Sequence, residues 1–551
     1  MLGGHAVAQC LHNEGVKHIF SVPGESYIAV VDGIYDHPDI KLITNRQEGC
    51  AAFMAEGYAK ATRNPGICLV TRGPGATSAS IGVHSATYDS APMVMLVGQV
   101  GRNARGREAG QEMDYEQVFG SFAKWVIEIN DPKQIPRIMS RAFHIARTGR
   151  PGPVIVSLPR DVTETDTTID MTQPLPEVKP NPDPAVVEAL IGRINAAKKP
   201  VLLIGSGTQY AHAWKEVIDF AEKFQLPVLT SYKRQDAFPN NHPNYAGNML
   251  TSNKHAQTLA YDETDLLIVL GSRLSQQTTA GFKFPRLGMP YVHIDAAEEN
   301  IGQNSRPEIG IISDSKQFLQ AALKHPAPRP NESRASWVAE HHAAQKQYCT
   351  PKERPTPKVS MERVMMDIKA AQPADMITTT DAGSFGQWQQ RYFEFDHPNS
   401  YISPSLGCMG PGVPSAVAAK LAYPNRTVVA HVGDGGFLMT GQEMATSKQY
   451  NAPIITIVYN NEGYNSIRMH QEAQYPGRRI GVALQNPDFA LMGESYGALG
   501  LKVSKDEEFM SAFKKALAAG RSALIEVQTD YEYVTPNATL TELRGKPLAG
   551  E

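Results

Sequence analysis

The residues with the clearest chemical potential are Asp434 and Asn461, each of which follows a short apolar run. The first lies in the triplet Gly433-Asp434-Gly435, and the second closes the pair Asn460-Asn461. The carboxyl ends of neighbouring parallel strands meet at one edge of a sheet, so we expect the two side chains to lie side by side. Carboxylate, amide and backbone carbonyl oxygens are ligands that Mg²⁺ accepts together with substrate phosphate. The pattern therefore predicts a magnesium site next to a phosphate group.

The same residues have a simpler interpretation. A glycine-flanked aspartate is usually a turn, and adjacent asparagines often begin a loop. The helical pattern Phe437–Tyr450 follows the triplet directly, and the N-terminus of a helix attracts phosphate. Glycine also lets the backbone approach an anion closely, so the combination favours the binding site.

Two further positions could do chemistry. Glu48 precedes a helical pattern of small residues, Gly49–Ala59, and Gly73 lies in the glycine-rich turn Thr71–Thr77. Taken alone, a glutamate at a helix start is usually a solvated charge that interacts with the helix dipole. Taken alone, the glycine-rich turn is compatible with any phosphate-binding loop or tight turn.

The elements that must position these residues repeat one pattern in three blocks. Short apolar runs alternate with helical patterns, which is typical of buried parallel strands. Proline-rich stretches, from about Val162 to Pro184 and from His325 past Pro357, read as linkers. We expect an α/β fold of three doubly wound parallel-sheet domains, at residues 1–165, 185–325 and 355–551. The predicted strands are His18–Val22, Gly66–Val70, Pro92–Gly98, Pro153–Leu158, Val201–Gly205, Leu226–Thr230, Asp265–Gly271, Tyr291–Asp295, Met376–Thr380, Thr427–Val432, Ile454–Asn460 and Ser522–Val527.

Composition excludes several classes of protein. The 551 residues are 42% hydrophobic and 20% charged, as in globular proteins rather than disordered chains. The net charge is −3 and no basic run stands out, so we expect no nucleic-acid partner. No apolar run reaches the roughly 20 residues of a membrane-spanning helix. We see no secretion signal, and five widely spaced cysteines without a CxxC pattern favour a cytoplasmic protein.

With these motifs in place, the chain resembles the thiamine-diphosphate enzymes of the acetolactate synthase and pyruvate decarboxylase superfamily. The resemblance implies a pyrimidine-binding first domain, a Rossmann-like central domain and a diphosphate-binding third domain. It implies that Asp434, Asn461 and the main-chain oxygen of Gly463 bind Mg²⁺, which holds the diphosphate of the cofactor. The other cofactor contacts that it implies are Gly73, Ser384, Phe385, Met409, Gly433, Gly435, Gly436 and Asn461.

The resemblance also implies catalytic roles. Glu48 matches the carboxyl group that activates the aminopyrimidine of the cofactor through a hydrogen bond to N1′. Gln111 lies in a segment similar to the active-site loop of acetolactate synthases. His470 stands where those synthases carry a tryptophan. Glu25 stands where they carry a small residue, and it is a candidate proton relay or, equally, the partner of an arginine.

The central block leaves its ligand open. Ile204-Gly-Ser-Gly-Thr-Gln209 resembles half of a dinucleotide fingerprint, without the third glycine. Related synthases hold FAD in this domain and some acyl-CoA relatives hold ADP. Lys233, Arg234 and Gln235 depart from the glycine-containing flavin loop of the synthases. A domain without nucleotide and one that binds FAD or ADP are about equally compatible with these residues.

These features predict a thiamine-diphosphate- and Mg²⁺-dependent carboligase or lyase that decarboxylates a 2-oxo acid, similar to acetolactate synthase. One alternative is a lyase that cleaves 2-hydroxy ketones or 2-hydroxyacyl-CoA without decarboxylation. A more remote alternative is a non-catalytic regulatory or binding homologue. The family implies a homodimer or homotetramer with the cofactor between subunits.

Overall fold

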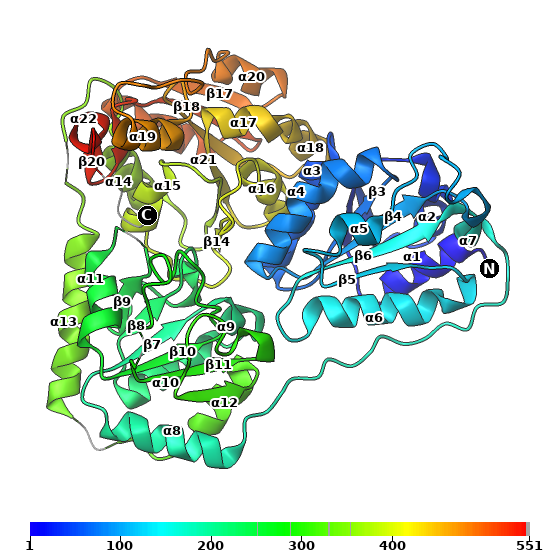
Figure 1. Cartoon of the computed structure of the whole chain (residues 1–551). Coiled ribbons are helices and arrows are strands. Elements are labelled where there is room, and N and C mark those ends of the chain that lie inside the picture. Colours follow the sequence, from blue (N-terminus) through cyan, green and yellow to red (C-terminus); the bar gives the residue numbers. More distant parts are fainter. Residues whose placement is uncertain (251, 287, 329–330, 353, 547–551) are drawn as a thin grey trace.

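The computed structural model describes residues 1–250, 252–286, 288–328, 331–352 and 354–546. Its described part contains three six-stranded sheets, and every strand pair within them is parallel. Helices cover both faces of each sheet, so the three sheets form separate lobes (Figure 1). The expected fold class, three doubly wound α/β domains, is therefore confirmed.

The first and third sheets share one topology, and the central sheet has another. In the first sheet the order is β2 (Lys41–Thr44), β1 (His18–Ser21), β3 (Gly66–Val70), β4 (Met93–Gln99), β6 (Pro153–Pro159) and β5 (Trp125–Glu128). In the third it is β14 (Tyr401–Ile402), β13 (Ile377–Thr380), β15 (Val428–Gly433), β16 (Ile455–Asn460), β18 (Ala523–Gln528) and β17 (Leu499–Val503). The central order is β12 (Ile309–Ile312), β11 (Tyr291–Asp295), β10 (Leu266–Leu270), β7 (Pro200–Ile204), β8 (Val228–Thr230) and β9 (Tyr245–Asn248), which is the Rossmann order.

The helices fall into the same three groups. The first domain holds α1 (Gly3–Asn13), α2 (Ile28–Tyr35), α3 (Glu48–Thr62), α4 (Pro74–Asp89), α5 (Tyr115–Phe119), α6 (Ile135–Arg147) and α7 (Arg160–Glu164). Around the central sheet lie α8 (Pro184–Ala196), α9 (Ser206–Tyr210), α10 (Trp214–Phe224), α11 (Lys254–Thr258), α12 (Ser315–Ala322) and α13 (Glu332–Tyr348). The third domain holds α14 (Met361–Ala371), α15 (Gly386–Tyr392), α16 (Gly412–Ala422), α17 (Asp434–Thr440), α18 (Met444–Gln449), α19 (Asn465–Gln474), α20 (Phe489–Ser495), α21 (Asp506–Leu517) and α22 (Leu540–Leu543), with the hairpin β19 (Tyr533–Thr535) and β20 (Ala538–Thr539).

The twelve predicted apolar runs are all strands, and they are the four inner strands of each sheet. The six strands that these runs did not identify are the two edges of each sheet. Inner strands are buried on both faces, which requires continuous apolar sequence. Edge strands such as β5 and β12 are only partly buried, and β14 is two residues long, so they carry no such run.

The two proline-rich stretches behave differently. Residues 165–183 form no helix and run as a long connection from the first to the central domain (Figure 1). The second stretch is a linker only in part, because it contains the 17-residue helix α13. This helix occupies an interval without proline and packs on β9, where the His342 ring lies 2.9 Å from the Tyr245 carbonyl oxygen. The linker prediction was wrong there.

The three domains meet at a buried cluster of charged side chains. The Lys60 ammonium of α3 lies 2.5 Å from Glu56 Oε1 and also contacts the Asp89 carboxylate at the end of α4. Asp89 Oδ1 accepts hydrogen bonds from Arg234 of the central domain, at 3.4 Å, and from the Ser405 N–H of the third domain, at 2.9 Å. One aspartate therefore connects all three domains.

Close helix packing brings the first and third domains together. α3 is rich in alanine and glycine, and a Cβ built on Gly57 would lie 2.7 Å from Ser415 of α16. No helix in the described part of the chain combines the length and the apolar character that crossing a membrane requires.

Candidate active site

The predicted metal residues lie at the carboxyl edge of the third sheet. Asp434 opens α17 immediately after β15, and it is 3% exposed. Its carboxylate accepts hydrogen bonds from the N–H groups of Gly435 at 2.8 Å and Gly463 at 3.1 Å, and from the Asn486 amide at 2.9 Å. Burial raises the pKa of Asp434, while these donors oppose that rise. The structure thus brings Asp434 next to the Gly463 backbone, the residue that the family resemblance implies as its neighbour.

Asn461 carries the second candidate metal ligand, a side-chain amide oxygen. Its Oδ1 atom is buried and has no hydrogen-bond partner among the described residues. Buried polar atoms without a partner are uncommon, and each calls for an explanation such as a bound ion. Asn461 directly follows the end of β16, the strand that pairs with β15, which ends beside Asp434. A buried carboxylate and an unsatisfied amide oxygen on adjacent strand ends fit the ligand preference of Mg²⁺.

Asn486 was not identified from the sequence. Its amide donates to Asp434 Oδ2 and to Asn460 Oδ1, both at 2.9 Å, and so connects the ends of β15 and β16. It lies in a loop before α20 with no motif around it, so only the fold reveals its position. Asn486 holds the two strand ends in register at the candidate metal site.

The glycines of this edge have no room for a side chain. A Cβ on Gly433 would lie 3.2 Å from the Phe385 ring, and one on Gly435 would lie 2.5 Å from the Tyr464 ring. A Cβ on Gly436 would lie 2.0 Å from Asp381 Oδ2. The backbone after β15 is therefore packed closely against Phe385, Tyr464 and Asp381.

Asp381 connects the other cofactor-binding segments that the sequence predicts. It follows β13 and accepts a hydrogen bond from Gly412 N–H at 2.6 Å, and burial raises its pKa to about 6. The adjacent Ala382 N–H donates to Cys408 O at 3.0 Å. These bonds fix the segment that carries half-buried Met409 beside the loop of Ser384. Phe385, also in that loop, stacks on Tyr459 with a 5.3 Å centroid separation.

The first domain gathers a second group of predicted residues at the carboxyl edge of its sheet. Glu48 opens α3 and makes no hydrogen bond or ion pair with any described residue. A Cβ on Gly75, at the start of α4, would lie 3.6 Å from Glu48 Oε1. Gly73 has a φ of +43°, and a Cβ there would lie 2.8 Å from the Gln111 carbonyl oxygen. Glu48, Gly73 and Gln111 therefore share one edge, and the carboxylate is unpaired.

Glu25 pairs with an arginine. Its Oε1 atom lies 2.5 Å from Arg72 Nη2, in the glycine-rich turn after β3. The Glu25 side chain is 67% exposed, whereas that of Arg72 is 14% exposed. Of the two roles that the sequence left open for Glu25, the arginine partner is the one the contacts favour, and the proton relay stays a prediction.

His470 lines a cavity of about 510 Å³ between the central and third domains. Ser384 and Gly407 of the third domain contribute to the wall, as do Tyr232 and Lys233 of the central domain. The cavity thus adjoins the segments predicted to hold the cofactor. Its size is in the range of small-molecule binding sites.

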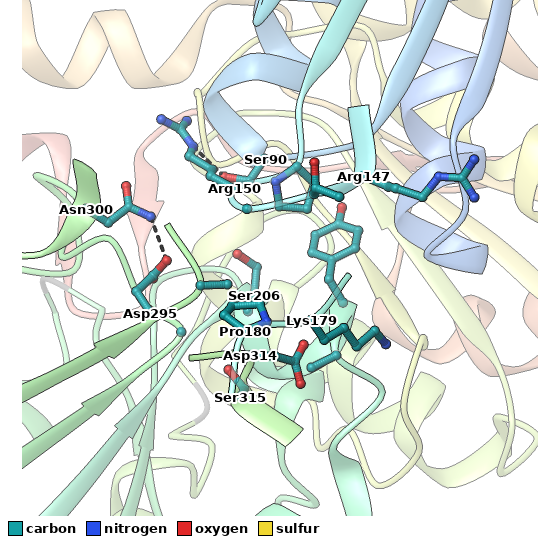
Figure 2. A pocket seen from close by; sticks show the side chains of 18 of the residues that line it. Ser90, Arg147, Arg150, Lys179, Pro180, Ser206, Asp295, Asn300, Asp314 and Ser315 are labelled. Carbon is teal, nitrogen blue, oxygen red and sulfur yellow. Dashed lines mark hydrogen bonds between the residues drawn. The ribbon is translucent and has the colours of Figure 1, made fainter. Parts of the chain in front are cut away.

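A smaller cavity, of about 70 Å³, lies at the switch point of the central sheet, between the ends of β7 and β10 (Figure 2). Figure 2 shows Asp295 and Asn300 joined by a hydrogen bond on one side, at 2.9 Å, with Ser206 below. Arg150 reaches the same cavity from the first domain, where it donates to Ser90 Oγ at 2.9 Å. The weak fingerprint therefore does lie at a ligand position of a Rossmann-order sheet.

Comparison with known proteins gives a consistent result along the chain. Residues 1–118 match the thiamine pyrophosphate enzyme N-terminal TPP binding domain, residues 187–322 match the central domain of such enzymes, and residues 381–527 match their C-terminal TPP binding domain. A probable acetolactate synthase large subunit of Methanocaldococcus jannaschii is 31% identical and aligns with 98% of this chain and 95% of its own length. The acetolactate synthase large subunit of Lactococcus lactis is 32% identical over 97% of this chain and 94% of its own length. The isozyme 3 large subunit of Escherichia coli is 30% identical over 97% of this chain and 96% of its own.

Proposed function

The chain belongs to the thiamine pyrophosphate enzyme family, and from this premise we propose that it is a Mg²⁺-dependent carboligase or lyase that decarboxylates a 2-oxo acid. The observation that carries the metal proposal is the unpartnered, buried Asn461 Oδ1 on the strand end next to the Asp434 carboxylate. Three relatives of nearly the same length named as acetolactate synthase large subunits support the reaction type.

In this proposal the third domain holds the diphosphate end of the cofactor. Asp434, Asn461 and the main-chain oxygen of Gly463 hold Mg²⁺, and the loops of Ser384 and Gly433–Gly436 contact the diphosphate. Gly436 presents backbone only, because Asp381 occupies the space that a side chain would need. Half-buried Met409 lies where the family places the residue that supports the bent cofactor. When bound, thiamine diphosphate supplies a nucleophilic carbon at C2 of its thiazolium ring.

The first domain supplies the groups that act on the reactive end. Glu48 holds a proton at N1′ of the aminopyrimidine, and its lack of a hydrogen-bond or ion-pair partner among the described residues supports this role. Gln111 and His470 face the substrate in this proposal. A non-decarboxylating lyase of 2-hydroxy ketones or 2-hydroxyacyl-CoA remains the alternative, because the pocket residues Glu25 and His470 depart from the acetolactate synthase pattern.

We propose that the active unit contains two copies of the chain. The family resemblance supports this proposal, and among the described residues Glu48 makes no hydrogen bond or ion pair with the third domain. A homodimer or homotetramer joins the first domain of one copy to the third domain of another. The test is to mix inactive Glu48→Gln and Asp434→Ala proteins after mild dissociation. Recovered turnover supports a shared site, whereas none after verified subunit exchange contradicts it.

For the central domain we propose that an ADP-type nucleotide is a better fit than FAD. A void of about 30 Å³ adjoins both cavities, sharing Ser90 with the 70 Å³ cavity and Tyr232 with the 510 Å³ cavity, and it is far smaller than a flavin ring. Arg234 closes this passage, because its buried guanidinium donates to Asp89 Oδ1. A flavin would have to displace this ion pair. Absorption near the flavin bands and chromatography of nucleotides released by acid distinguish FAD, ADP and an empty domain.

The decisive experiment on the reaction is product analysis by NMR. The purified protein is incubated with thiamine diphosphate, Mg²⁺ and pyruvate, without FAD. Acetolactate or acetoin supports the decarboxylating carboligase. If no pyruvate is consumed, larger 2-oxo acids and 2-hydroxyacyl-CoA are tried under the same conditions. Cleavage of 2-hydroxyacyl-CoA without release of CO₂ would replace the proposal with the alternative lyase.

We also propose a cytoplasmic location, which five free thiols support.

A further inference from the structure

The cavity between the central and third domains has more room than a three-carbon acid needs. Its volume is about 510 Å³, and Leu250, Met469 and Leu543 give it apolar stretches. Ser384 places one end beside the predicted diphosphate site, and Tyr232 and Lys233 form part of the opposite, central-domain wall. A substrate whose carbonyl lies at the cofactor could therefore extend toward the central domain.

Lys233 is the unusual residue of this wall. It is 3% exposed, and its ammonium donates to Pro404 O at 2.8 Å and lies 5.5 Å from the centre of the Tyr232 ring. Within the described residues, no carboxylate lies within the 4.0 Å of an ion pair with this ammonium. Burial lowers the pKa of Lys233 to about 8, so the side chain is mostly protonated at neutral pH.

Lys60 shows that an ammonium in this part of the molecule can be neutralised. It is buried at the same junction, but Glu56 and Asp89 both lie against it. A buried ammonium that lacks such a partner is costly, because it has lost its hydration without gaining an opposite charge. Asp89 and Asp381 lie near enough to Lys233 to interact with its charge, but among the described residues neither forms an ion pair with it, whereas two carboxylates contact Lys60 directly.

The backbone supports the same conclusion. Lys233 has a φ of +56°, a left-handed conformation that residues other than glycine and asparagine rarely adopt. The next residue fixes this conformation, because Arg234 donates to the Lys233 carbonyl at 2.8 Å and is itself held by Asp89. Strained residues that their surroundings fix in place concentrate at functional sites.

We propose that Lys233 binds a carboxylate of the substrate that is distal to the reacting carbonyl, so that the enzyme prefers a dicarboxylic 2-oxo acid or an acidic carbonyl acceptor. This inference rests on the proposed function. The carboxylate next to the reacting carbonyl leaves as CO₂, and a cation that held it would stabilise the ground state. A distal carboxylate survives the reaction and supplies the direct ion pair that no described carboxylate makes with Lys233.

Two matched pairs of substrates test separately whether the molecule with the distal carboxylate is the donor or the acceptor. As donors, 2-oxoglutarate is compared with 2-oxovalerate, which has the same number of carbons and lacks the distal carboxylate. As acceptors with pyruvate as donor, succinic semialdehyde is compared with butanal. In Lys233→Met the ratio of kcat/KM for the acidic over the neutral member falls about tenfold to a hundredfold in at least one pair. Lys233→Arg retains part of the preference.

Lys254→Met is the matched control, because Lys254 lines the same cavity but is exposed and donates to Gln257. An equal loss of selectivity in this variant would mean general attraction of anions and would overturn the assignment to Lys233. Wild-type enzyme without a preference in either pair would overturn it as well. Each variant is first checked for an unchanged melting temperature and Mg²⁺-dependent cofactor affinity.

A binding measurement separates this inference from the proposed reaction. Calorimetry on the cofactor-loaded enzyme compares glutarate with pentanoate. Neither molecule has a 2-oxo group, so neither can be decarboxylated. Glutarate is expected to bind at least about tenfold more tightly to wild type than to Lys233→Met, whether or not any 2-oxo acid turns over. Equal affinity for the two proteins refutes the anion site even if pyruvate is a good substrate.

Discussion

Asp89 is the residue whose removal should disturb the association of the three domains most directly. Its carboxylate contacts the Lys60 ammonium and accepts hydrogen bonds from Arg234 Nη2 at 3.4 Å and Ser405 N–H at 2.9 Å. In Asp89→Asn the amide oxygen can still accept from Ser405. The substituted side chain carries no negative charge, so Lys60 keeps only the Glu56 carboxylate and Arg234 loses its contact with a carboxylate.

The size of the effect follows from burial. Removing one partner from a buried ion pair lowers stability by about 3–5 kcal/mol, because the other charge stays buried without compensation. In a cooperative unit the size of the first domain, 1 kcal/mol shifts the midpoint by about 2–4 °C. The expected decrease in the apparent melting temperature is therefore roughly 6–20 °C. It is measured by scanning calorimetry at a fixed scan rate and protein concentration, since a protein of this size is expected to unfold irreversibly.

Asp219→Asn is the matched control, with the same substitution at an exposed ion pair. Asp219 lies 2.5 Å from Lys215, whose side chain is 80% exposed, and such surface pairs contribute little. We expect its melting temperature to change by about 2 °C or less. A decrease of less than about 2 °C in Asp89→Asn would refute the reasoning. It would mean that water or a local rearrangement compensates the two cations as well as the carboxylate does.

The remaining predictions concern the cofactor site and pH. Glu48→Gln should lower turnover by at least about 100-fold with cofactor affinity by calorimetry nearly unchanged, and wild-type rates would remove Glu48 from its role. Asp434→Ala should abolish Mg²⁺-dependent cofactor binding in the same assay, and unchanged affinity would contradict the metal assignment. Gly436→Ala should weaken cofactor binding, because its Cβ would lie 2.0 Å from Asp381 Oδ2; wild-type affinity would show that the loop adapts. Burial raises the pKa of Glu56 to about 7, so the folded state binds its proton more tightly and stability should fall as the pH rises from about 4.5 to 7. Glu56→Gln should reduce the difference in melting temperature between pH 5 and pH 7.5, and an equal difference in both proteins would exclude Glu56 as its source.

The strands show which parts of this fold the sequence patterns predict. Every inner strand was predictable, because a strand covered on both faces by helices must be apolar throughout. Edge strands were missed because one side faces solvent or another loop; β5, for example, is only partly buried along its whole length. The helix α13 was missed because the prolines around it dominated the composition of the whole stretch, although its own residues are compatible with a helix.

The residues of the candidate site also fall into two groups, those that a local motif identifies and those that only the fold brings in. Asp434, Asn461 and the glycines around them lie in short contiguous motifs, so their types and order alone predicted the chemistry and the edge of the sheet at which it occurs. Asn486 and Asp381 contact the same site from loops distant in sequence, and only the fold shows that they do. The partner of Glu25 is 47 residues away in the chain, and the sequence could offer it only as an alternative.

The sequence by itself thus determined the inner strands, the three-domain α/β class and the resemblance to thiamine-diphosphate enzymes. These depend on hydrophobic burial and on local backbone motifs, which a chain encodes over a few consecutive residues. Only the tertiary structure decided which buried charges are compensated. The sequence does not distinguish Lys60 from Lys233. α3 and α4 bring Glu56 and Asp89 into direct contact with Lys60, whereas the loop after β8 places Lys233 in a cavity wall where no described carboxylate forms an ion pair with it. Charge compensation depends on contacts between distant segments, and no local pattern records them.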